Sequence, residues 1–87
     1  MTVPESLAIQ VLLFARYAEA AGVEAMTVEV PAGSTVAAVL ERVRIRLSRP
    51  EGLPPRPLVA LNRSQTDLLA SVKDGDELAI LPPVAGG

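Results

Sequence analysis

The sequence contains neither cysteine nor histidine, and these two absences exclude several classes of chemistry at once. A chain without thiols has no disulfide framework and no cysteine nucleophile, and without either residue it cannot form the usual zinc sites. The missing imidazole also removes the side chain that most often acts as a general base near neutral pH. The chain therefore brings little catalytic equipment of its own.

Aromatic residues, excess charge and long apolar runs are also lacking. Phe14 and Tyr17 are the aromatic residues, so a core has to come from the 26 leucine, valine and isoleucine side chains. The net charge of −2 gives no electrostatic footprint for nucleic acid. No apolar run approaches the ~18 residues that span a membrane, and residues 1–6 lack the basic start and apolar stretch of a signal peptide. A cytoplasmic protein without nucleic-acid or membrane partners is expected.

What is present is the pattern of one small α+β domain of 87 residues. Residues 1–7 are expected to form a flexible leader, residues 8–81 the folded domain and residues 82–87 a projecting tail. The run 8–15 is apolar on both alternating faces, which predicts a central strand covered on both sides. Its two faces divide as follows: Ile9, Val11, Leu13 and Ala15 on one, and Gln10, Leu12 and Phe14 on the other, which the glutamine marks as the surface side.

The next elements are a short helix, a strand and the main helix. Residues 16–21 favour a helix that Gly22 can end in the left-handed conformation, and residues 26–30 read as a strand that could pair antiparallel with the first. Ser34 or Thr35 can cap the main helix. Its apolar stripe has the spacing of an amphipathic helix: Val36, Val39, Leu40, Val43 and Leu47. The arginines off this stripe are interpreted as a solvated face: Arg42, Arg44 and Arg46.

Two further strands complete the domain. The proline-rich segment 48–57 is expected to be irregular, followed by a strand at 58–62 and a short ordered excursion at 64–72. A turn at 73–76 then leads into the last strand, 77–81, with Leu78 and Ile80 inward and Ala79 and Leu81 outward. Three carboxylates at this turn are interpreted as part of a solvated turn rather than as a metal site: Asp74, Asp76 and Glu77.

The tail is the most distinctive stretch. Pro82 and Pro83 fix φ and favour an extended rod that leaves the last strand without folding back. Gly86 and Gly87 have no Cβ, so a partner's walls can close around their backbone and a nucleophile can reach the terminal carboxylate. The six tail residues reach roughly 20 Å when extended.

These features carry a family resemblance. The matching landmarks are Val-Leu-Leu-Phe-Ala at 11–15, Val-Ala-Leu-Asn at 59–62, Asp-Gly-Asp-Glu at 74–77 and Pro-Pro-Val-Ala-Gly-Gly at 82–87. With them the chain resembles the small subunits of molybdopterin synthase, in the sulfur-carrier family of ubiquitin-like β-grasp proteins. The resemblance implies a mixed sheet with one main helix on one face and the first and last strands parallel in the middle. Phe14 and Leu81 would then lie side by side with Leu12 and Ala79, as an exposed apolar patch for a partner.

The resemblance also implies a mechanism. An ATP-dependent activating enzyme adenylates the carboxylate of Gly87, and a sulfur donor converts it to a thiocarboxylate. The tail then enters the large subunit of a heterotetramer of two small and two large subunits. Two thiocarboxylates in succession donate sulfur to cyclic pyranopterin monophosphate and so form the dithiolene of molybdopterin. No stably bound cofactor is expected, because ATP is used by the activating enzyme. Gly87 is the covalent site, and the partner-binding residues are expected to be Phe14, Leu12, Leu81, Pro82, Pro83, Val84, Ala85 and Gly86.

Three alternatives remain open from the sequence. The chain could carry sulfur for thiazole or cysteine biosynthesis, since a diglycine end suits any carrier of this kind. It could be a ubiquitin-like modifier, in which the same glycine forms isopeptide bonds to lysines. It could also be a plain β-grasp binding module whose tail is incidental.

Overall fold

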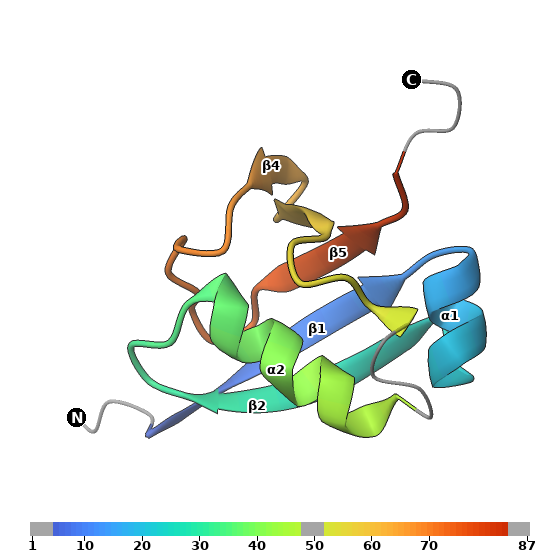
Figure 1. Cartoon of the computed structure of the whole chain (residues 1–87). Helices are drawn as coiled ribbons and strands as arrows, with labels where there is room; N and C mark the ends of the chain where they lie inside the picture. Colours follow the sequence, from blue (N-terminus) through green and yellow to red (C-terminus); the bar gives the residue numbers. More distant parts are fainter. Residues whose placement is uncertain (1–4, 48–51, 84–87) are drawn as a thin grey trace.

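The computed structural model describes residues 5–47 and 52–83, and within them it contains a five-stranded mixed sheet and two helices (Figure 1). The elements are β1 (Ser6–Leu13), α1 (Arg16–Ala21), β2 (Ala25–Pro31), α2 (Val36–Arg46), β3 (Leu58–Leu61), β4 (Ser64–Thr66) and β5 (Glu77–Leu81). The strands lie in the order β2-β1-β5-β3-β4. β1 and β5 are parallel, and the other neighbours are antiparallel. This is the α+β architecture that the sequence predicts, with α2 on one face of the sheet.

Residues 9–13 divide into the two faces predicted for them, although only one face is covered, whereas Ala15, predicted on the inner face, lies beyond the strand and is exposed. Ile9 and Val11 are fully buried beneath α2, whereas Gln10 is exposed and Leu12 is half-buried. The prediction of a strand covered on both sides was therefore wrong. The outer face of β1 is apolar for another reason: it forms part of the exposed surface described in the next subsection.

The domain also begins earlier than predicted. β1 starts at Ser6, where it pairs with Pro31 of β2, and Leu7 is buried in the core. The proposed leader of residues 1–7 is thus too long, because Ser6 and Leu7 belong to the sheet. Residues 1–4 lie outside the described residues.

α2 supplies the buried stripe that its spacing predicts. All five stripe positions are buried against the inner faces of the strands: Val36, Val39, Leu40, Val43 and Leu47. Thr35 is the N-cap residue, as predicted, but its side chain makes no capping bond. The amides of Val36 and Ala37 instead donate to the carbonyl oxygens of Ala70 (2.9 Å) and Leu68 (3.0 Å). The backbone of a distant segment therefore satisfies the free N–H groups at this helix end.

The second half of the sheet holds one strand that was not predicted. β4 pairs antiparallel with β3 through a two-residue turn, in which Asn62 and Arg63 both have positive φ (49° and 72°). Such turns match the twist of paired strands. The predicted turn before β5 is confirmed, with Gly75 at φ 86°, and Leu78 and Ile80 point inward and are fully buried.

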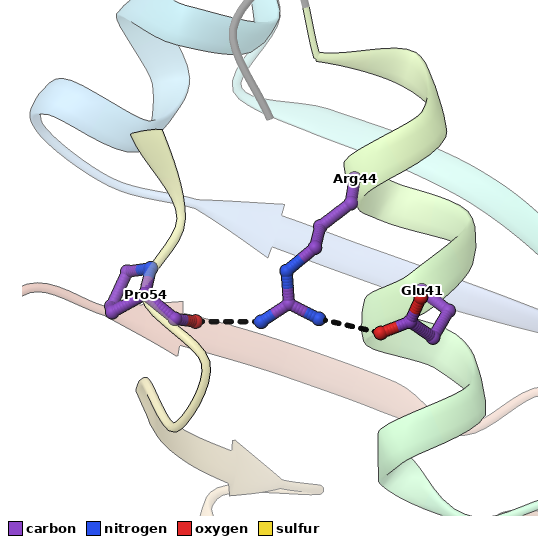
Figure 2. Close-up of polar contacts among 3 residues, drawn as sticks. All are labelled: Glu41, Arg44 and Pro54. Atoms are coloured by element: carbon purple, nitrogen blue, oxygen red, sulfur yellow. Dashed lines mark hydrogen bonds and ion pairs between the residues drawn. The ribbon is translucent and has the colours of Figure 1, made fainter. Parts of the chain in front are cut away.

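The arginines of α2 do more than face solvent. Figure 2 shows that Arg44 donates to the carbonyl oxygen of Pro54 (2.6 Å) and pairs with Glu41 (2.9 Å), with 20% of its side chain exposed. Arg46 donates to the carbonyl oxygen of Thr27 in β2 (2.8 Å). The solvated-face interpretation is confirmed for the exposed Arg42 and Arg46 and is wrong for the largely buried Arg44, while Arg44 and Arg46 also tie α2 to its neighbours.

Candidate functional site: the uncovered sheet face at the root of the tail

The site is built where β1 and β5 end at the same edge of the sheet. Their parallel register places Leu12 opposite Ala79 and Leu13 opposite Ile80, so Phe14 follows at the level of Leu81. Because side chains alternate along a strand, Leu12, Ala79 and Leu81 point away from α2. No described helix covers that side of the sheet (Figure 1).

β3 extends this surface by two residues that sequence reasoning missed. The antiparallel register pairs Leu58 with Leu81 and Ala60 with Ala79. Val59 between them is buried, so Leu58 and Ala60 share the outward side. The alternation of side chains within 58–61 indicates that Leu58 and Ala60 share a face. The sequence did not show which face, because the pairing of this strand with β5 was unknown. We call the resulting surface the apolar face; its residues are Leu12, Phe14, Leu58, Ala60, Ala79 and Leu81.

The apolar face remains accessible in the isolated chain. Phe14 is 43% exposed and Leu58 is 36% exposed, while the other four residues are half-buried by one another. Phe14 follows β1 and Leu58 begins β3, on either side of β5, so two large apolar side chains stay exposed on one surface, as is typical of an interaction site. The structure therefore brings Phe14, Leu12 and Leu81 together, as predicted, on a surface suited to a partner.

The tail leaves β5 directly beside this face. Pro82 is half-buried and Pro83 is exposed, and both lie beyond the end of the strand. A proline cannot donate to a ladder of backbone hydrogen bonds, so the two prolines end β5. Four predicted functional residues lie outside the described residues: Val84, Ala85, Gly86 and Gly87. The covalent role predicted for Gly87 is therefore untested by the structure.

The acidic turn before β5 is a structural element. Asp74 accepts a hydrogen bond from the amide of Ala8 (2.7 Å), and Asp76 accepts one from the amide of Lys73 (2.7 Å) and one from the side chain of Asn62 (3.0 Å). These carboxylates hold the turn against β1 and the β3–β4 connection. Within residues 5–47 and 52–83, no group of three potential ligands is placed to hold a metal ion.

The arrangement can therefore bind a protein and present a chain end. The described part of the chain holds a core of apolar side chains and no buried polar or charged residue. No helix in this part is long and apolar enough to cross a membrane.

A mixed sheet with β1 and β5 parallel at its centre, one main helix across it and an outgoing tail defines a ubiquitin-like β-grasp protein. Residues 11–87 match the ThiS family, and the chain belongs to that family. The resemblance noted from the sequence landmarks is confirmed. This chain is 40% identical over 82 residues to the molybdopterin synthase sulfur carrier subunit of Arabidopsis thaliana. The matched region covers 94% of this chain and 85% of that protein.

Solved structures agree on the fold. The crystal structure of SAMP1 from Haloferax volcanii superposes with a TM-score of 0.77 at 31% identity, covering 92% of this chain and 99% of that one. A chain of the crystal structure of the Amycolatopsis orientalis BexX/CysO complex superposes with a TM-score of 0.65 at 32% identity, covering 92% of this chain and 100% of that one. A chain of the complex of subunits 1 and 2 of the molybdopterin-converting factor from Helicobacter pylori superposes with a TM-score of 0.53 at 29% identity. The superposition covers 93% of this chain and 100% of that one.

Proposed function

We propose that this chain is the sulfur-carrier subunit of a molybdopterin synthase, and that it carries sulfur on the carboxylate of Gly87. The observation that carries the proposal is the joining of the Pro-Pro-Val-Ala-Gly-Gly tail to β5 at the edge of the apolar face. The name of the Arabidopsis relative supports the same assignment. A protein without cysteine can carry sulfur in this way, because the sulfur is bound to the C-terminal carboxylate and not to a thiol.

The chemistry follows from the weakness of a carboxylate as an electrophile. Adenylation joins a terminal oxygen of Gly87 to the α-phosphorus of ATP and releases pyrophosphate. A nucleophilic sulfur of the donor protein then attacks the acyl carbon and AMP leaves. If the donor is a persulfide, a second thiol of the donor cleaves the resulting acyl disulfide, which leaves the thiocarboxylate on the chain and a disulfide on the donor. The chain contributes the nucleophilic carboxylate and the backbone clearance of Gly86, whereas the activating enzyme contributes ATP and the groups that polarise it.

The partner that uses the thiocarboxylate is a large subunit with the pterin-binding pocket. The apolar face docks on that subunit while Pro82 to Gly87 enter the pocket, and two successive deliveries complete the dithiolene of molybdopterin. The Helicobacter pylori complex supports this, since there a protein of the same fold is associated with subunit 2 of the molybdopterin-converting factor. An assembly of two small and two large subunits is proposed.

Intact mass of the protein purified from its native host tests the carrier function. We expect a fraction of the chain to carry the mass increase that results when one oxygen is replaced by sulfur, located at Gly87 by fragmentation. Copurification then tests the pathway, with the large subunit of molybdopterin synthase as the expected partner. Complete absence of the thiocarboxylate form under conditions of active cofactor synthesis would contradict the proposal.

A second candidate is favoured by the likeness to SAMP1 and to CysO. One is named a small archaeal modifier protein in its other solved structure, and the other was solved in complex with BexX. A modifier would give higher-mass conjugates that vanish when Gly87 is deleted. A carrier for thiazole or cysteine synthesis would instead copurify with the corresponding synthase.

A further inference from the structure

An open cleft of about 580 Å³ lies between α1 and the segment 52–57. Its walls include Leu58 of the apolar face and Pro83 at the root of the tail. The cleft is therefore continuous with the candidate docking surface. It differs from that surface in its charge, because Arg16 and Arg56 also line it.

These two guanidinium groups have no acidic partner in the part of the chain that the structure describes. Both residues are exposed, and the ion pair found there, Arg44 with Glu41, lies elsewhere. Arg16 is held instead over the ring of Tyr17, 5.8 Å from its centroid. The cleft thus presents two uncompensated positive charges in a protein whose net charge is −2.

Arg56 is carried by an anchored stretch of backbone. It stands between Pro55 and the buried Pro57, which restrict the local φ angles. The same segment is held to α2 by the hydrogen bond from Arg44 to the carbonyl oxygen of Pro54 (2.6 Å; Figure 2), and by the buried side chain of Leu53. A preorganised arginine loses less entropy on binding, and its planar donors suit carboxylates.

We propose that this cleft binds an acidic segment of the large subunit that accepts the tail, with its carboxylates paired to Arg16 and Arg56. The inference rests on the function proposed above. Phosphate groups of ATP or of the pterin are poor candidates for the same site. ATP and the pterin both react with the carboxylate of Gly87, four residues beyond Pro83, and a chain of that length reaches up to about 13 Å.

The experiment measures the dissociation constant for the large subunit of molybdopterin synthase from the same organism, at low and at high salt. The test variant is R16E/R56E, and the matched control is R42E/R63E, which changes the net charge equally at exposed positions outside the cleft. We expect the test variant to bind roughly tenfold or more weakly at low salt, with a smaller loss at high salt, because exposed charge pairs are screened. The control should stay within about threefold of wild type.

Thermal unfolding of each variant verifies the fold, and the neutral variant R16Q/R56Q provides a milder version that should lose part of the affinity. The inference is overturned if R16E/R56E binds like wild type, or if the control loses as much. Phe14→Arg separates the two proposals, because it should weaken docking by about thirtyfold or more whether or not the arginines matter. If the wild-type chain does not bind the large subunit at all, the proposed function fails and the inference fails with it.

Discussion

At the scale of single residues, Ala15 has a backbone conformation that alanine rarely adopts. Its φ of 51° and ψ of −128° lie in a region that glycine enters far more readily, because a Cβ crowds the neighbouring backbone there. The residue redirects the chain from β1 into α1 and follows Phe14 directly. This local strain therefore fixes where Phe14 stands on the apolar face.

Ala15→Gly tests the strain. Glycine relieves the strained backbone at this position, and this effect outweighs the added flexibility of the unfolded chain. We therefore expect the free energy of unfolding to rise by about 1 kcal/mol, or Tm to rise by roughly 4–8 °C. Differential scanning calorimetry measures it. Ala37→Gly is the matched control inside α2, where the same change should cost about 0.5–1 kcal/mol. A loss of stability in Ala15→Gly would show that the conformation is not strained.

Phe14→Arg tests the docking role of the apolar face. Because the side chain is 43% exposed, the change should shift the free energy of unfolding by no more than about 0.5 kcal/mol. Binding to the large subunit should weaken by about 2 kcal/mol or more, as for a central aromatic contact. Calorimetry and titration measure the two effects. Unchanged affinity would remove Phe14 from the interface.

At the scale of elements, the segment 52–57 depends on α2. Arg44→Ala removes the hydrogen bond to Pro54, and bonds of charged groups contribute about 1.5–3 kcal/mol when buried. Since Arg44 is partly exposed, we expect a loss of about 1 kcal/mol and faster amide hydrogen exchange in 52–57. Arg42→Ala, on the exposed side of the same helix, should change neither. Equal exchange in both variants would argue against the anchor.

The elements that the sequence predicted well are those with a local code. The stripe of α2 needs only a period of 3.6 residues, and the turn at Gly75 needs only one residue tolerant of positive φ. β4 has no such code: Ser64, Gln65 and Thr66 form a strand because the Asn62–Arg63 turn returns them to β3. The backbone bonds at the start of α2 were likewise unpredictable, since their acceptors lie more than thirty residues away.

At the scale of the whole molecule, the same distinction applies to the site. Phe14 and Leu81 could be paired from the sequence because the β-grasp resemblance supplies the parallel register of β1 and β5. The place of Leu58 on the apolar face and the cleft of Arg16 and Arg56 could not be predicted, since four separate segments meet at the cleft. Tertiary assembly, rather than any local pattern, brings those charges to the root of the tail.

Extension of the chain tests the assembly as a whole. One alanine added after Gly87 moves the carboxylate out of register with any activating site and gives it a side chain. We expect loss of the thiocarboxylate form by intact mass and loss of molybdopterin synthesis in cells, with docking through the apolar face retained. An alanine added before Met1 serves as the control and should have no effect. Full activity of the C-terminal extension would support an incidental tail.

Lys73, the single lysine of the chain, lies in the turn that precedes β5, whereas Pro82 and Pro83 at the root of the tail follow the other end of that strand. An acyl adenylate is consumed by any amine or thiol that reaches it. If the end is activated as proposed, the body beside it offers no thiol and keeps its one ε-amine at the far side. Sulfur delivery then competes with hydrolysis rather than with acylation of a thiol or lysine side chain beside the tail.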